Sequence, residues 1–300
     1  MAISRAQLVK ELEPGLNALF GLEYKSYANE HAEIFDTESS DRAFEEEVML
    51  SGFANASVKP EGQGVQFDDA QETFTARYTN ETIALAFAIT EEAIEDNLYD
   101  RLASRYTKAL ARSMANTKQV KAAAVLNNGF NANFAGGDGV ALFATNHPTI
   151  AGTFSNELAV ASDLNETSLE QALIDIAAMT DERGLKIASR GMKLIIPSAL
   201  QFTADRLMKS EGRTGTADND INAVRNMGMI PEGYTVNHFL TSNKKWFIKT
   251  DVPNGLKHFV RSPIKTSMEG DFDTGNVRYK ARERYVFGFS DPRGIFGSDI

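Results

Sequence analysis

The segment from Glu91 to Asn128 constrains the fold of this chain most, because it contains neither Gly nor Pro. Its apolar residues recur mostly every three or four positions, the spacing of one helix face: Ile94, Leu98, Leu102, Tyr106, Leu110, Met114, Val120 and Ala124. Thr90 is a suitable N-cap, and Gly129 follows the expected end. Such a helix is roughly 57 Å long, whereas a compact domain of this length is only ~50 Å across. The segment therefore predicts a flattened or elongated molecule.

Composition narrows the class of protein. The 300 residues are 42% apolar and 24% charged, as in ordinary globular proteins, and the formal net charge is −10. That charge argues against phosphate binding over the whole surface. The chain has no cysteine, so neither disulfides nor thiol chemistry can hold the fold or do its work. No signal peptide and no stretch long enough to span a membrane is visible, so we expect a cytosolic protein without a membrane partner.

The first 50 residues have the character of an arm. A short helix around Leu8 and Leu12 is expected to break at Pro14 and Gly15. Between residues 30 and 47, eight acidic residues accompany a single base, Arg42. This acidic segment is either a solvated face or an arm that lies across a basic surface of a neighbouring copy.

The next region, residues 59–89, has the pattern of β structure. We expect a hairpin turn at Asp68, Asp69 and Ala70. The apolar positions are even up to Tyr78 and odd from Ile83 onward. A strand that changes its buried face packs against two different partners. Since a thin polar hairpin is marginal alone in water, we expect its distal part to lie on another subunit.

From residue 165 the pattern becomes α/β. A capping box formed by Thr167 and Glu170 is expected to start one helix. A strand over 193–196, a helix over 198–209 and strands over 234–239 and 246–249 follow, with a mobile polar loop at 210–220.

The last segment, residues 277–289, alternates between apolar and basic side chains, and Glu283 interrupts the apolar set. One face is aromatic; the other is a basic stripe formed by Arg278, Lys280, Arg282 and Arg284. Residues 273–276 form the expected turn back to a strand over 264–268. The stripe could follow nucleic-acid phosphates, but in so acidic a chain we favour an acidic protein surface as its partner.

Residues that carry chemistry are sparse. The four histidines are scattered without metal-ligand spacing. No nucleophile elbow, phosphate-binding loop or paired carboxylates stand out. We therefore predict no catalytic residue, no cofactor and no metal, and not an enzyme. Two alternatives remain: a nucleic-acid-binding module that uses the strand Arg278–Arg284, and a hydrolase of α/β type.

The ordered segments resemble those of a known family. Four of them carry the resemblance: DTGNVRYKARERYVFGFSDPRGIFGS at 273–298, TNETIALAFAITEEAIEDNLY at 79–99, FATNHP at 143–148 and WFIKTDVPNGLKHFVRSPI at 246–264. Together with their connections they cover most of the chain after residue 45. The sequence is similar to major capsid proteins of tailed bacteriophages with the Hong Kong 97-type fold, in particular to the Mu-like major head subunit.

The resemblance implies an α+β fold divided into five regions. These are an N-terminal arm (1–50), an extended β-hairpin loop (51–82), a peripheral domain with the spine helix 91–128 (83–166), an α/β axial domain (167–251) and a return to the peripheral domain (252–300). Lysine cross-linking, found in some members, is not expected, because the presumed tip is Asp68–Ala70 and only Lys59 stands near the base.

The resemblance also implies function and partners. The chain would form pentamers and hexamers of itself that close into an icosahedral virion shell around double-stranded DNA, without sequence-specific binding. Portal, scaffolding and decoration proteins would be partners, and assembly would take place in the host cytoplasm. We expect three sets of residues to form the contacts between subunits. They belong to the acidic segment, to the extended loop with the strand after it, and to the basic stripe: Glu45, Glu46, Glu47, Gln66, Phe67, Asp68, Asp69, Phe74, Arg278, Lys280, Arg282 and Arg284.

Overall fold

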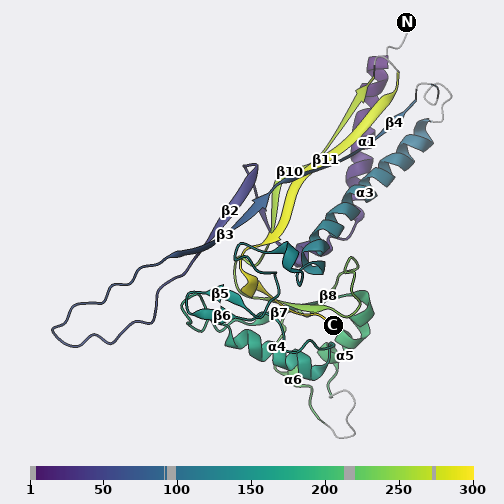
Figure 1. Cartoon of the computed structure of the whole chain (residues 1–300). Coiled ribbons are helices and arrows are strands. Elements are labelled where there is room, and N and C mark those ends of the chain that lie inside the picture. The colour runs from purple at the N-terminus through teal and green to yellow at the C-terminus, as the bar shows by residue number, and fades with distance from the viewer. Residues whose placement is uncertain (1–4, 91, 93–98, 213–219, 272–274) are drawn as a thin grey trace.

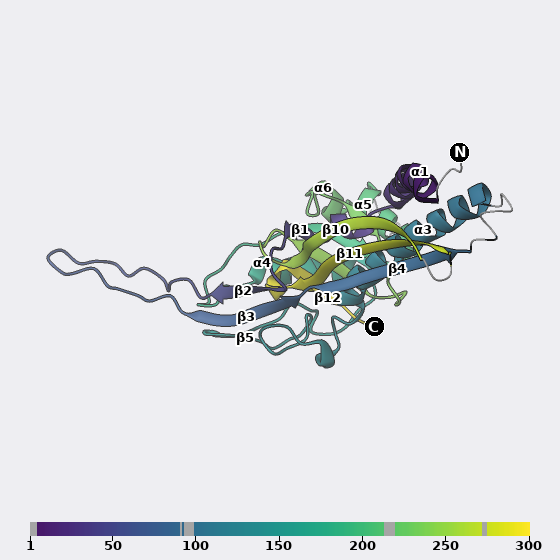
Figure 2. The ribbon, with the colours of Figure 1, turned by 90° about the horizontal axis from the view of Figure 1, so that it is seen from above.

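The computed structural model describes residues 5–90, 92, 99–212, 220–271 and 275–300. An elongated upper part made of two helices and a sheet stands on a rounded lower part, and a long loop projects to one side (Figure 1). Seen from above, the loop and the sheet lie along one line (Figure 2). The predicted elongated shape is therefore present.

The upper part is built on a four-stranded sheet in the order β1-β10-β11-β4. Its elements are β1 (Asp36–Ser39), β4 (Glu81–Ile89), β10 (Leu256–Gly270), β11 (Val277–Phe289), α1 (Arg5–Ser26) and α3 (Tyr99–Asn127). β11 pairs antiparallel with both β10 and β4. The helices cover one face, where Phe20, Met114 and Tyr279 share an apolar core. The predicted pairing of the last strand with residues 264–268 is confirmed, and this strand packs on the long helix. The predicted turn at 273–276 lies partly outside the described residues.

The long helix α3 has 29 described residues and ends at Asn127, one residue from the predicted end. Its predicted start at Glu91 and residues 93–98 lie outside the described part of the chain, so the N-cap predicted at Thr90 stays a prediction. Leu110 and Met114 are buried, as the apolar spacing predicted, whereas Tyr106 and Val120 are about half exposed. The buried side continues instead through Leu126.

The predicted break in the N-terminal helix is wrong. Helix α1 continues through Pro14 and Gly15 for 22 residues. Proline at position 14 removes one backbone hydrogen bond. Burial of Leu16 and Phe20 against α3 and β11 offsets that loss, because tertiary packing outweighs local propensity. The residues that follow Pro14 are thus part of this subunit's own core.

The lower part contains a second four-stranded sheet, in the order β12-β9-β7-β8. Its elements are β7 (Gly191–Ile196), β8 (Tyr234–Val236), β9 (Trp246–Thr250), β12 (Ile295–Ser298), α4 (Glu166–Ala178), α5 (Gln201–Lys209) and α6 (Ala223–Asn226). The capping box of α4 is formed by Asn165 and Ser168, not by the predicted Thr167 and Glu170. Asn165 already accepts the Ser168 N–H, so the helix begins two residues earlier.

Short elements complete the chain. They are the hairpins β2 (Phe44–Leu50) with β3 (Glu72–Thr79) and β5 (His147–Thr149) with β6 (Gly152–Phe154), and the 3-10 turns η1 (Glu30–Glu33), η2 (Ala132–Phe134), η3 (Ser198–Leu200) and η4 (Pro292–Gly294). The described helices include none that is both long and apolar enough for a membrane span.

One strand serves two sheets, and Asn80 marks the change. β3 pairs with β2, whereas β4, which begins one residue later, pairs with β11. The Asn80 side chain donates to Ser40 Oγ at 2.8 Å and to the Arg42 carbonyl at 3.0 Å. Tyr78 on one side packs on Phe259, while Phe87 on the other packs on Tyr279. This is the predicted change of buried face.

Candidate subunit interface

The extended loop of residues 51–71 leaves the hairpin β2–β3 and reaches far from both sheets (Figure 1). Its turn lies at residues 61–62, where the Gln63 N–H donates to the Pro60 carbonyl. The predicted turn at Asp68–Ala70 and the predicted base position of Lys59 are both wrong, since Lys59 adjoins the tip and Asp68 lies at the base. The turn that forms contains Pro60 and Gly62, whereas the prediction rested on the acidic pair Asp68 and Asp69.

The loop carries apolar side chains that no described residue of its own subunit covers. Val58 and Phe67 are more than 90% exposed, and Phe53 and Val65 are 60% or more exposed. Few hydrogen bonds join the two arms of the loop; one runs from Ser57 Oγ to Gln66 Oε1 at 2.9 Å. Exposed apolar groups of this kind mark surfaces that bind a partner.

The acidic triplet on β2 divides between internal and external roles. Glu45 accepts from Ser40 Oγ at 2.7 Å, and this bond holds the pKa of its carboxyl below the usual range. Glu47 contacts buried Lys257 at 3.4 Å. Glu46 makes only an exposed ion pair with Arg77, 3.8 Å away. Of the three predicted contact residues, Glu46 is the one whose charge faces outward.

The other predicted loop residues lie at two levels. Phe67 and Gln66 are on the exposed arm, whereas Asp68 and Asp69 sit at the base beside Arg183. Phe74 on β3 is half-buried against its own subunit. The structure therefore brings Phe67 and Glu46 to the outside of one projecting hairpin and keeps the base acids in internal contacts.

The basic stripe lies on the open face of the upper sheet. Arg278, Lys280 and Arg282 are exposed, while the alternate residues Tyr279, Ala281 and Tyr285 are buried under the helices. Arg278 pairs with Asp271. Among the described residues, Lys280 and Arg282 have no acidic partner. The predicted alternation is confirmed, although Arg284 is half-buried and not exposed, and the described part of the subunit holds no acidic partner for Lys280 and Arg282.

Neighbouring strands extend this basic face in ways that the sequence pattern did not reveal. The register places Lys265 of β10 beside Arg282, and Ala84 and Ala86 of β4 beside Arg282 and Lys280. Lys265 and both alanines are exposed. The result is a basic row of Lys265, Lys280 and Arg282 next to a strip of small side chains. Only the strand order, which pairs Lys280 with Ala86 and Arg282 with Ala84, could have located it.

The acidic N-terminal segment is largely solvated, as one interpretation of the sequence expected, and it also pairs with bases of its own subunit. The pairs are Glu30 with His238, Glu33 with Lys193, Asp36 with Lys249, and Glu38 with Lys257. Lys257 is buried, and although burial favours its neutral form, Glu38 and Glu47 outweigh this and raise its pKa. Parallel pairing of β1 with β10 places the segment there.

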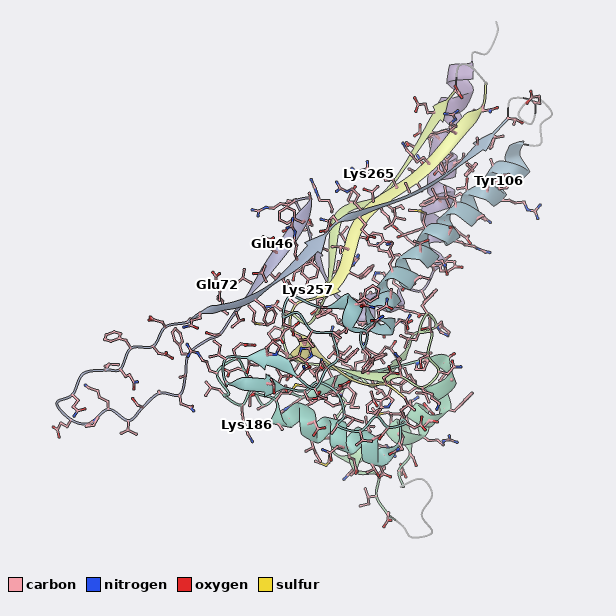
Figure 3. All side chains as sticks on the ribbon, viewed as in Figure 1. Glu46, Glu72, Tyr106, Lys186, Lys257 and Lys265 are labelled. Atoms are coloured by element: carbon pink, nitrogen blue, oxygen red, sulfur yellow. The ribbon has the colours of Figure 1, made fainter. Side chains whose placement is uncertain are left out.

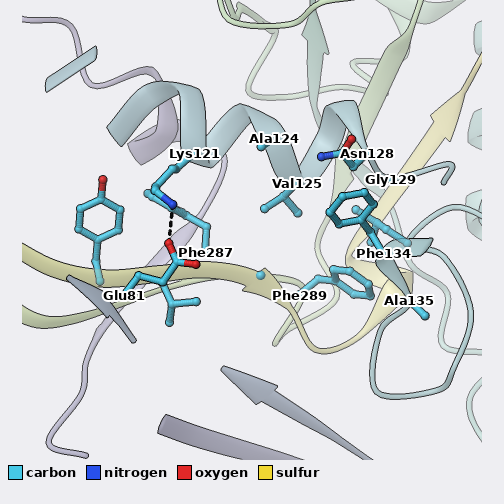
Figure 4. Close-up of a pocket in the computed structure, with 14 residues that line it drawn as sticks. Glu81, Lys121, Ala124, Val125, Asn128, Gly129, Phe134, Ala135, Phe287 and Phe289 are labelled. Carbon is cyan, nitrogen blue, oxygen red and sulfur yellow. Dashed lines mark hydrogen bonds and ion pairs between the residues drawn. The ribbon is translucent and has the colours of Figure 1, made fainter. Parts of the chain in front are cut away.

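An apolar groove of about 440 Å³ lies between α3 and the end of β11 (Figure 4). Val125, Phe287 and Phe289 line it, and the ion pair of Lys121 with Glu81 stands at its rim. The polar side chains at this groove are the ion pair, the Asn128 amide and the Tyr285 hydroxyl, which do not form a nucleophile–base pair. Within the described ranges, no three His, Asp or Glu side chains gather as metal ligands.

Comparisons with known proteins agree with this architecture. A family model described as phage capsid protein matches residues 72–297. Comparison with curated protein sequences finds no match. The virus-like particle of Pyrococcus furiosus is similar over 95% of this chain and 98% of its own, with 11% identity and a TM-score of 0.55. The capsid of an empty GTA particle (90% and 89% covered, 11% identity) and the mature capsid of bacteriophage PhiM1 (90% and 86%, 12%) both have TM-scores of 0.58. The predicted Hong Kong 97-type α+β fold is confirmed.

Proposed function

Because the chain belongs to the phage capsid protein family, it is a structural subunit of a virion shell, and we propose that it forms this shell as pentamers and hexamers around double-stranded DNA. The projecting loop carries the proposal. Its apolar side chains are covered only if another copy is present, so the free energy of burying them is available only on assembly.

The surface that receives the loop is, in this proposal, the basic face of a neighbouring subunit. The hairpin carries Glu46 and Glu72 outward, and Lys265 lies on the open sheet (Figure 3). Lys280 and Arg282 have no acidic partner within the described subunit, which makes them available to such a neighbour. The small alanine side chains beside them allow a second chain to approach closely.

Further partners belong to the same proposal. Portal, scaffolding and decoration proteins would bind the shell, and assembly would take place in the host cytoplasm. The enclosed DNA would be held without sequence readout, and the protein would have no enzymatic activity. The Mu-like subtype rests on the segments quoted from the sequence. A net charge of −10 suits a wall along which packed DNA must slide.

Electron microscopy of the purified chain, with sizing chromatography, tests the proposal. We expect shells, tubes or capsomers whose abundance rises with protein concentration. A protein that stays monomeric at high concentration and binds DNA with steep salt dependence would instead favour a nucleic-acid-binding module.

Charge reversal tests the contact itself. We expect the double variant Lys280→Glu and Arg282→Glu to fold normally, because both side chains are exposed, and to fail to assemble. The matched control is Lys186→Glu with Lys244→Glu, which makes the same change of charge at exposed positions away from the sheet. If both double variants assemble like the unmodified chain, the basic face is not the contact.

A further inference from the structure

The base of the extended loop touches a turn that belongs to the lower part of the molecule. This turn, residues 180–186, follows α4 and is held by the Asp181 side chain. Asp181 Oδ1 accepts the N–H groups of Arg183 at 2.9 Å and Leu185 at 2.8 Å. Gly184 takes a φ of +81°, which a residue with a side chain rarely adopts. The turn is therefore fixed locally.

Arg293, in η4, also holds this turn in place. Arg293 donates to Glu182 Oε1 at 2.8 Å, and both side chains are less than 5% exposed. Arg293 Nε also donates to the Thr180 carbonyl at 2.8 Å. A buried ion pair with additional hydrogen bonds holds its partners in one geometry. Arg183 consequently projects from a rigid platform.

Arg183 reaches the point where the two arms of the loop come together. Its Nη2 donates to the Asp69 carbonyl at 2.6 Å and lies 3.8 Å from Asp68 Oδ1. Asp68 Oδ2 in turn accepts the N–H of Ala54, on the opposite arm, at 2.7 Å. Arg183 is only 18% exposed, and its buried Nε has no acceptor among the described residues. The contacts of the Arg183 guanidinium named here are therefore those to the base of the loop.

We propose that Arg183 is a positioning residue for assembly, and that it fixes the direction in which the loop leaves the subunit before any neighbour is present. The contact is wholly within one chain, so it already exists in the free subunit. A loop held in one direction spends more time in the orientation that a neighbour can bind, and apparent affinity scales with that fraction. The effect on assembly rests on the proposed function; the effect on the loop does not.

Distance measurement in the free subunit tests the positioning directly. Since the chain has no cysteine, spin labels can be attached at Gln63→Cys on the tip and Ala177→Cys on α4 without other changes. We expect a narrow distance distribution that broadens at least about twofold in Arg183→Gln, with an unchanged thermal midpoint. Arg183→Lys, which keeps one donor, should give an intermediate width. Lys186→Gln, an exposed base on the same turn, is the control and should stay narrow.

Assembly of the same variants supplies the second readout. Arg183→Gln should raise the concentration needed for assembly roughly fivefold, as expected if the competent orientation falls to a fifth, and Arg183→Lys should recover part of it. An equally narrow distribution in Arg183→Gln would overturn the positioning role. A broadened loop with assembly at the same or lower concentration would overturn its role in assembly. If no variant and not even the unmodified chain assembles, the proposed function fails while the loop measurement still stands.

Discussion

Single residues at the junction of helices and sheet carry charge into the core. Glu283 interrupts the apolar face of β11 and is 1% exposed. Lys118 of α3 reaches it at 3.3 Å, and the Tyr24 hydroxyl donates to it at 3.2 Å. Burial raises the pKa of Glu283, although Lys118 opposes this. Through Tyr24, Lys118 and Glu283, the elements α1, α3 and β11 are joined at one point.

Removing Lys118 should therefore be costly. We expect Lys118→Met to lower the free energy of unfolding by about 3 kcal/mol, because Glu283 would be left as an unpaired buried carboxylate. The control is Lys121→Met, which breaks an exposed pair with Glu81 and should cost less than about 1 kcal/mol. Urea unfolding measures both, and equal losses would contradict the argument.

His258 makes the stability of the folded chain depend on pH. It is 2% exposed and stacks on Phe287 at 4.2 Å. Burial, with the charges of Lys118 and His31, lowers its pKa to about 3. Between pH 6.5 and 3 the unfolded state binds the proton and the folded state does not, so stability falls as the pH falls through this range. The loss from this group at pH 4 is about 3 kcal/mol.

Replacing His258 isolates that contribution. His258→Phe keeps the ring stack, so the unfolding free energy should fall less steeply between pH 6.5 and 4 than in the unmodified chain. Parallel slopes for His258→Phe and the unmodified protein would count against a buried neutral histidine.

Among whole elements, the hairpin β2–β3 depends on a close approach to the connector after α3. A Cβ added at Gly137 would lie 2.6 Å from the Thr75 carbonyl oxygen and 2.9 Å from the Ala76 nitrogen. Both are backbone atoms of β3 and cannot rotate away. Only a residue without a side chain fits there, so this glycine sets how closely the hairpin sits on the body.

Gly137→Ala should thus lower the unfolding free energy by about 2 kcal/mol, the usual cost of overpacking. Gly270→Ala, where a Cβ meets nothing within 4 Å, is the matched control and should be neutral. Thermal unfolding compares them. A neutral Gly137→Ala would mean that the hairpin can shift without loss.

The elements differ in how far the sequence predicted them. The alternation in β11 and the change of face at Asn80 followed from side-chain period alone, which local sequence records. The loop tip and the continuity of α1 through Pro14 did not, because turn residues occur at several places and long-range burial of Phe20 overrides a local breaker. For the candidate interface, the sequence identified the basic stripe. Arg183 and Lys265 became visible only when the fold brought distant segments together.

For the molecule as a whole, the proposed contact joins an acidic projection to a basic face, so salt should weaken it. The screening length falls from about 10 Å at 0.1 M to about 3 Å at 1 M salt. We expect the concentration needed for assembly to rise between these two conditions, measured by light scattering. Assembly that is indifferent to salt or promoted by it would show that the apolar loop side chains dominate instead.

The switch of one strand between two sheets at Asn80 has a geometric consequence. In the proposed contact, the projecting loop of one subunit binds the basic face of the next, so the two contacting surfaces differ. Repeated copies must therefore either close into a ring or continue as an open filament. The angle between the projecting loop and the basic face of the same subunit decides which of the two results. Because only Asn80 separates β3 from β4, the junction at Asn80 contributes to that angle. A change of a few degrees there is a change in how many copies complete a circle, and hence in the curvature of the wall they build.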